Sequence, residues 1–176
     1  MKIGIALLAY NRPKHLKKVI DAIVKEKIKS INIYIDGPAD KKVQNNQDKI
    51  LKVLKNYKSK ILINLIRQTK NNGLAFSVTN AVTSELKYND AVILLEDDCV
   101  PLNGFFDYMI GGLKKYRFNK NVRSVCSYNN LDIKSESAFF LKRFNPWGWA
   151  TWKDRWKKHN FEIKNTILQI KNNGSI

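Results

Sequence analysis

The feature that most constrains the fold is a repeated alternation of short apolar runs with segments of helical periodicity. The first run, from Ile3 to Ala9, is almost entirely apolar, which is typical of a strand buried on both faces of a parallel sheet. After it, Pro13 suits a first helical turn, and apolar residues recur on one face with Lys between them. Those apolar residues are Leu16, Val19, Ile20, Ile23 and Val24.

The same strand-helix unit recurs along the chain. Further strands are predicted from Ile31 to Ile35, from Ile61 to Ile66 and from Ala91 to Leu95. The helices between them carry apolar faces at Val43, Ile50, Leu51 and Leu54, and at Leu74, Val78, Ala81, Val82 and Leu86. A helix from about Phe105 to Tyr116 and a short strand around Ser124 to Ser127 follow. This alternation predicts a doubly wound α/β domain with a mostly parallel sheet and helices on both faces.

The charge and composition narrow the function only a little. A net charge of +17 over 176 residues invites a nucleic-acid-binding or anionic-membrane-binding role. The excess is mostly dispersed Lys, however, and it accompanies abundant Asn and Ile, a mixture that codon bias also produces. No run approaches the roughly 20 apolar residues of a membrane span. Cys99 and Cys126 lack the spacing of a zinc or redox site, so we expect reduced thiols in a soluble cytoplasmic protein.

Polar residues follow each predicted strand at the edge of the sheet where ligands bind. They are Asn11-Arg12, Asp36, Asn72-Gly73 and Glu96-Asp97-Asp98. Three consecutive acids repel one another unless a cation compensates them, and Mg²⁺ or Mn²⁺ does so with one or two protein carboxylates while substrate phosphates complete the shell. The alternative is a solvated acidic turn in which Asp98 caps a later helix.

Two interpretations remain open for each of the other polar segments that follow a predicted strand. Asp36 suits a contact to a nucleobase or ribose, or simply an Asp-Gly-Pro turn. Arg12 suits a diphosphate contact at a helix N-terminus, or a solvated surface position. Asn72-Gly73 and Ser77 suit ligand contacts or a helix-entry turn.

Four Trp residues cluster late in the chain. Trp149, Trp152 and Trp156 have the spacing of one helix face, for which core packing is the default role. Trp147-Gly148-Trp149 follows Pro146, and its rings are assigned either to the core or to the wall of a sugar pocket.

This ordered set of motifs resembles GT-A glycosyltransferases, whose acidic "DXD" element ends the fourth strand. The likeness is closest to the N-acetylglucosaminyltransferase I family and related bacterial, family 2-like sugar transferases. It rests on six stretches: Ala9-Tyr10-Asn11-Arg12-Pro13, Tyr34-Ile35-Asp36-Gly37, Asn72-Gly73, Leu95-Glu96-Asp97-Asp98, Ser124 to Asn129, and Phe144-Asn145-Pro146-Trp147-Gly148-Trp149. Val100-Pro101 with Phe105-Phe106 also matches the family's pattern.

The resemblance implies a Rossmann-like nucleotide-diphospho-sugar transferase fold and a role for each motif. Asp98 becomes the ligand of a Mn²⁺ or Mg²⁺ ion, with Asp97 beside it, and Glu96 and Asp97 lie near the donor sugar and ribose. Tyr10, Asn11, Arg12, Asp36, Asn72, Gly73 and Ser77 contact the nucleotide-sugar, and Trp147, Gly148 and Trp149 form the donor or acceptor pocket. The donor is expected to be a UDP-sugar, and the acceptor a glycan or a lipid-linked glycan of a bacterial surface polysaccharide.

The family is inverting, so a carboxylate base is expected, but no match to it lies between His159 and Ile176, and Glu162 lacks the aromatic context. We therefore expect residues 1–128 to form the nucleotide-sugar-binding half and residues 129–176 to begin a truncated acceptor-side half. A nucleotidyltransferase remains an alternative, although Ala9 to Pro13 lacks the Gly of its phosphate loop. A basic module that binds nucleic acid or the inner face of an anionic membrane is the other alternative; no specific nucleic-acid site is expected.

Overall fold

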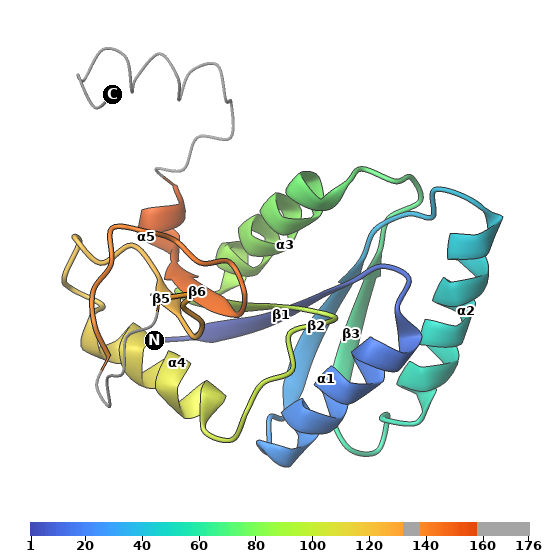
Figure 1. The fold of residues 1–176 in the computed structure, drawn as a ribbon, viewed down its shortest axis with the longest axis horizontal. Helices are drawn as coiled ribbons and strands as arrows, with labels where there is room; N and C mark the ends of the chain where they lie inside the picture. Colours follow the sequence, from blue (N-terminus) through green and yellow to red (C-terminus); the bar gives the residue numbers. More distant parts are fainter. Residues whose placement is uncertain (132–137, 158–176) are drawn as a thin grey trace, which may run out of the picture.

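The computed structural model describes residues 1–131 and 138–157 and forms a sheet covered by helices on both faces (Figure 1). The strands are β1 (Ile3–Ala9), β2 (Ser30–Ile35), β3 (Leu62–Arg67), β4 (Ala91–Glu96), β5 (Val125–Cys126) and β6 (Trp149–Trp152). The helices are α1 (Pro13–Lys25), α2 (Lys41–Lys55), α3 (Leu74–Tyr88), α4 (Phe105–Lys115) and α5 (Lys153–Trp156). The predicted α/β class with a mostly parallel sheet is confirmed.

The strand order in the sheet is β3-β2-β1-β4-β6-β5. The first four strands are parallel, whereas β6 pairs antiparallel with β4, and β5 antiparallel with β6. β1 and β4 lie in the centre, which explains why both sequences are apolar on both faces. β3 and β5 are the two edge strands, and Leu62 on β3 is 63% exposed.

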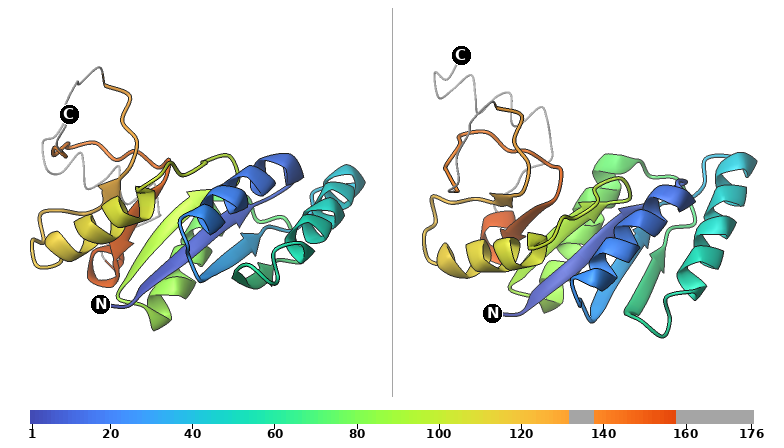
Figure 2. Two further views of the ribbon diagram at one scale, coloured as in Figure 1. Left: turned by 90° about the horizontal axis from the view of Figure 1, so that it is seen from below. Right: turned by 60° about the horizontal axis from the view of Figure 1, so that its bottom comes forward.

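Two helical layers enclose the sheet (Figure 2). One contains α1, α2 and α4, whose side chains pack with Leu7, Ile33 and Ile93 of the sheet. The other is formed mainly by α3, whose Ala81, Val82 and Leu86 pack against the opposite face. Odd-numbered and even-numbered residues of the central strands therefore enter different cores, as the alternation of side chains along a strand requires.

The first layer is tied together by a polar contact between its helices. The Tyr57 hydroxyl, just after α2, donates a hydrogen bond of 2.6 Å to Asp21 of α1, and Lys17 pairs with the same carboxylate at 2.7 Å. Burial and the bond to Asp21 raise the pKa of Tyr57. The hydrogen bonds from Lys17 and Tyr57 lower the pKa of Asp21.

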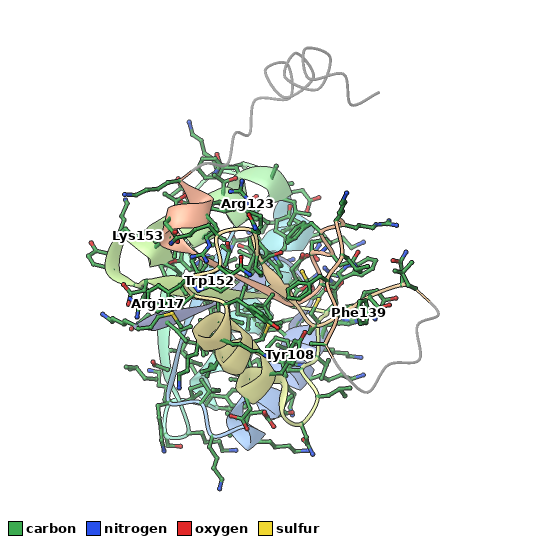
Figure 3. All side chains as sticks on the ribbon, turned by 90° about the vertical axis from the view of Figure 1, so that its left-hand side faces the viewer. Tyr108, Arg117, Arg123, Phe139, Trp152 and Lys153 are labelled. Carbon is green, nitrogen blue, oxygen red and sulfur yellow. The ribbon has the colours of Figure 1, made fainter. Side chains whose placement is uncertain are left out.

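The prediction that Trp149, Trp152 and Trp156 share a helix face is wrong. Trp149–Trp152 is strand β6, and the helix that follows it within the described residues is the short α5. The two Trp residues of β6 point to opposite faces of the sheet, Trp149 into the α3 core and Trp152 into the other. The Trp152 indole N–H donates to the Leu113 carbonyl at 3.0 Å, which secures α4 to the sheet (Figure 3).

Strand β6 belongs to the segment 129–176 that the sequence assigns to an acceptor-side half. It adds directly to β4, so this segment completes the sheet that carries the first half. Within the described ranges, no helix combines the length and the apolar character needed to cross a lipid bilayer.

Candidate functional site

The candidate site lies where the strand order reverses. β1 has β2 on one side and β4 on the other, and both neighbours run parallel to it. Leu8 pairs with Glu96, so β1 and β4 end side by side. In parallel α/β sheets, ligands bind in the crevice outside the carboxyl ends of the strands at such a reversal.

Two cavities lie along this edge. The first, which we call the switch-point pocket, has a volume of about 370 Å³ and is lined by seven of the predicted residues: Tyr10, Arg12, Asp36, Gly73, Ser77, Glu96 and Asp97. The second, the aromatic pocket, has a volume of about 680 Å³ and is lined by Asp98, Trp147 and Gly148, together with Phe105, Tyr108 and Tyr128. The acidic run separates the two pockets, because Asp97 lines the first and Asp98 the second.

Arg12 bridges the two aspartates at this boundary. Its Nη2 lies 2.9 Å from Asp97 Oδ1, and its Nη1 lies 2.7 Å from Asp98 Oδ2. Asp97 is buried and also accepts the Tyr10 backbone N–H at 3.2 Å, whereas the Asp98 side chain is 41% exposed. The carboxylate of Asp98 is therefore the more accessible of the two to a ligand from solvent.

Glu96 and Asp97 at the end of β4 have raised pKa values. Burial raises the pKa of Glu96, and the charges of Asp98 and Asp97 raise it further. Burial also raises the pKa of Asp97, although Arg12 and the Tyr10 N–H oppose the rise. Burial lowers the pKa of Arg12, but the charges of Asp97 and Asp98 outweigh it and raise that pKa overall. Additional positive charge near the acidic run stabilises its ionised form.

The carboxylate of Asp36 holds a loop in place. It is 7% exposed and accepts backbone N–H groups from Gly37, Asn72 and Gly73 at 2.8 to 3.2 Å. Gly37 is required because a Cβ there would lie 2.2 Å from the Lys70 carbonyl carbon. Gly73, with φ of +82°, turns the chain into α3. Asp36 therefore shapes the pocket wall by fixing residues 70–73.

Ser77 lies one turn into α3 and lines the same pocket. Its hydroxyl oxygen is buried and has no hydrogen-bond partner among the described residues. A buried polar atom without a partner costs free energy that a hydrogen bond from a ligand would recover.

The structure adds to this wall Tyr34 and Asn71, to which the sequence assigned no ligand contact. The Tyr34 hydroxyl donates to the buried Glu85 at 2.8 Å, and burial together with this bond raises the pKa of Tyr34. Asn71 Nδ2 donates to the Tyr10 hydroxyl at 2.9 Å. Tyr34 lies two residues before Asp36, and residues two apart in an extended segment point to the same side, so the sequence did contain a signal for Tyr34. For Asn71 the sequence contained no signal other than its position next to Asn72.

Three predicted residues do not line either pocket. Asn72 donates its backbone N–H to Asp36 and its side-chain amide to the Lys70 carbonyl, while Asn11 is half-buried beside the pocket. Trp149 is 5% exposed and packs between Phe144 and Trp156 in the core, because it belongs to strand β6. Glu162 and the rest of the stretch weighed for a catalytic base lie outside the described residues.

The aromatic pocket offers apolar surface to a ligand. Trp147, 52% exposed, packs edge-on against Tyr128 with ring centroids 4.9 Å apart. Tyr108 of α4 donates its hydroxyl to the Cys126 carbonyl at 3.2 Å, and burial raises its pKa. Gly148, with φ of +66°, leaves no room for a side chain, since a Cβ would lie 2.7 Å from Ser127 Oγ.

The residues present suit a divalent cation that is shared with a ligand. Among the described residues, no group of three or more His, Cys, Asp and Glu side chains is arranged to hold a metal by itself. Asp98 offers an accessible carboxylate with two further acids behind it. Mg²⁺ and Mn²⁺ typically bind one or two protein carboxylates and complete their coordination shell with phosphate oxygens, so this arrangement suits either ion. The cation would compete with Arg12 for Asp98.

Comparisons with known proteins show the fold. No family model matches the chain, and no curated protein matches it by sequence. Among solved structures, a mannosyltransferase from Pyrobaculum calidifontis, in complex with GDP-Man and Mn²⁺, is similar with a TM-score of 0.50 and 13% identity, over 71% of this chain and 34% of its own. The chain thus spans about a third of that protein.

A second similar structure is a 4-diphosphocytidyl-2C-methyl-D-erythritol synthase from Anaerococcus prevotii. Its TM-score is 0.53 at 14% identity, over 97% of this chain and 84% of its own. With the strand order and the pocket at the strand reversal, these similarities lead to one conclusion. The chain shares its α/β fold with this mannosyltransferase and this synthase.

Proposed function

We propose that this chain binds a nucleotide-diphospho-sugar across the switch-point pocket and the aromatic pocket, and that it is the donor-binding part of a glycosyltransferase. The observation that carries the proposal is the position of Glu96-Asp97-Asp98 between two pockets at the strand reversal. A nucleotide in the smaller pocket and a sugar in the aromatic pocket would meet at Asp98. The mannosyltransferase complex with GDP-Man and Mn²⁺ supports this choice of ligand.

Each side chain has a role in this proposal. Asp98 would hold the divalent cation, with Asp97 behind it as the anchor for Arg12. Glu96 and the free hydroxyl of Ser77 would meet the ribose or sugar, and the loop held by Asp36 would enclose the base. When bound, the cation would neutralise negative charge on the leaving nucleoside diphosphate. Arg12, once released from Asp98, would point at the same phosphates.

The donor, the stereochemistry and the acceptor are proposed in addition, beyond what the position of the acidic run supports by itself. We propose a UDP-sugar as donor, inversion at the anomeric carbon, and a glycan or lipid-linked acceptor in the synthesis of a bacterial surface polysaccharide. The aromatic pocket supports a carbohydrate acceptor or donor sugar, because exposed aromatic rings such as Trp147 offer the apolar faces that pyranose rings pack on.

A nucleotidyltransferase is the second candidate, and the similarity to the synthase over 84% of its length favours it. That reaction requires donors from the first loop to surround a triphosphate. Here the loop from Ala9 to Pro13 carries no Gly, and the Tyr10 backbone N–H is already bonded to the buried Asp97. We therefore rank this function second.

A thermal-shift panel separates these functions. The protein is melted with UDP, GDP, CDP, their sugar conjugates and the parent triphosphates, each with Mn²⁺ and with excess chelator. A ligand that binds only the folded state raises the melting temperature. We expect a shift with one nucleoside diphosphate and a larger one with its sugar conjugate, both dependent on the metal. A preference for a triphosphate would favour the nucleotidyltransferase, and equal shifts in chelator would overturn the metal-bridged site.

A further inference from the structure

The two helical layers of the protein differ sharply in charge. The layer of α1, α2 and α4, with the turns that follow these helices, comprises residues 13–29, 39–60 and 102–120. These ranges contain 17 Lys and Arg against 5 Asp and Glu, a net charge of +12 out of +17 for the whole chain. We call the outer side of this layer the basic face.

The opposite layer has no such excess. Residues 71–90, which contain α3, carry Lys87 as the one basic residue against Glu85 and Asp90, a net charge of −1. A compositional bias toward Lys would enrich both layers alike. The charge is therefore placed on one side of the molecule, and composition alone does not account for it.

The charges of the basic face point to solvent and are little neutralised. All 13 Lys of residues 13–29 and 39–60 are exposed, while the apolar residues of α1 and α2 point into the core. Among the described residues, Lys17 with Asp21 is the one ion pair made within these ranges. A solvent-facing, unpaired array of Lys attracts an anionic surface over distances up to about the Debye length.

Exposed apolar side chains flank α4 of this layer at both ends. Leu102 precedes the helix and is 80% exposed, and Phe118 follows it and is 83% exposed. Phe140 is 68% exposed and packs edge-on against Tyr116 at the end of α4, with ring centroids 5.3 Å apart. Lys arrays with exposed aromatic and aliphatic side chains are typical of proteins that lie on anionic bilayers.

We propose that the basic face docks on an anionic lipid surface. Lys supplies 16 of its 17 positive charges, which suits a diffuse lipid headgroup layer more than nucleic acid, where the planar Arg side chain is preferred. Neither α1 nor α2 contains a Phe, Tyr or Trp on which a base could stack, and the one ring side chain other than Pro in these helices is His15 of α1. Because α4 lines the aromatic pocket through Phe105 and Tyr108, docking would place that pocket near the lipid surface.

Vesicle sedimentation tests the proposal. The full chain is mixed with phosphatidylcholine vesicles, with or without phosphatidylglycerol, at low and high salt. The face variant is Lys18→Glu, Lys42→Glu, Lys49→Glu and Lys52→Glu together. The matched control, Lys2→Glu, Arg67→Glu, Lys87→Glu and Lys157→Glu, removes the same total charge away from the face. Thermal melting checks that both variants fold.

We expect wild type to sediment with the anionic vesicles only, and less so at high salt. The face variant should bind at least about 100-fold more weakly, since each Lys near an anionic bilayer contributes about 1 kcal/mol, whereas the control should stay within about threefold of wild type. Equal losses in both variants would overturn a specific face. Tighter binding of duplex RNA than of vesicles, with the same variant pattern, would assign the face to nucleic acid instead. The nucleotide panel above is independent of either result.

Discussion

Arg12 and Asp98 form a salt bridge, with Nη1 and Oδ2 2.7 Å apart, at the boundary between the two pockets. The same guanidinium pairs with Asp97, so one positive charge is shared between two carboxylates and leaves them under-compensated. A divalent cation at Asp98 would do the same task with twice the charge. The Arg12 guanidinium and a bound divalent cation would therefore compete for the carboxylate of Asp98.

Arg12→Gln should strengthen the binding of Mn²⁺ in the absence of nucleotide, because it frees Asp98. A partly exposed ion pair of this kind contributes up to about 1 kcal/mol, so we expect about fivefold tighter binding in a calorimetric titration. The matched control is Lys14→Gln, which removes an equal charge from an exposed position two residues away. Unchanged Mn²⁺ affinity in the Arg12 variant would show that the guanidinium and the metal do not compete.

Asp36→Asn should destabilise the fold by about 2 kcal/mol, because an amide nitrogen would face backbone N–H groups of Gly37, Asn72 and Gly73. Denaturant unfolding measures the change. Asp40→Asn is the matched control: Asp40 caps α2 by accepting the Val43 N–H, a task that Asn performs equally well. If Asp36→Asn kept full stability but lost nucleotide binding, Asp36 would be the direct base or ribose contact that the sequence predicted.

These two residues also show what sequence reasoning could and could not supply. The apolar runs of β1 and β4 located those strands within a residue, since burial on both faces leaves a strong pattern, and the apolar faces predicted from helical periodicity lie in α1 to α4. The edge position of Arg12 and Asp36 followed from the strand ends. Their partners did not, because the approach of Gly37 to Lys70 and of Arg12 to Asp98 depends on how separate loops meet in space.

Strand β6 illustrates the other limit. Over the four residues from Trp149 to Trp152, periodicity does not distinguish a strand from a helix, and the spacing to Trp156 favoured a helix. The free edge of β4 decides the outcome, because pairing with Trp149–Trp152 satisfies backbone groups that would otherwise stay unpaired. A local pattern contains no information about that edge.

Glu96→Gln should raise the melting temperature at pH 7. Burial and the neighbouring aspartates raise the pKa of Glu96, so its ionised form destabilises the folded state. Because the folded state binds the proton more tightly, wild type should gain stability as the pH falls from 7 toward the unfolded pKa of Glu. The advantage of the variant should therefore shrink over that range. A variant that melts lower than wild type at pH 7 would contradict this.

Trp147→Ala should leave the binding of a nucleoside diphosphate unchanged while weakening that of its sugar conjugate. Trp147 lines the aromatic pocket and not the switch-point pocket, so the two ligand parts are separated. We expect the affinity gain from the sugar to fall by about tenfold, typical of a lost aromatic contact. Tyr88→Ala, an equally aromatic and 76% exposed position on α3, is the control. Equal losses for both ligands would remove the aromatic pocket from donor binding.

The most direct test of the central claim is a calorimetric titration of wild type, Asp98→Asn and Asp97→Asn with UDP and Mn²⁺. Asp98→Asn keeps the side-chain volume and removes the anionic oxygen that a hard cation prefers, so metal-dependent binding should be lost while the melting temperature is maintained. Asp97→Asn should reduce affinity less, because Asp97 acts through Arg12. Wild-type affinity in the Asp98 variant would contradict the account, since the acidic run would then be a turn that binds no metal.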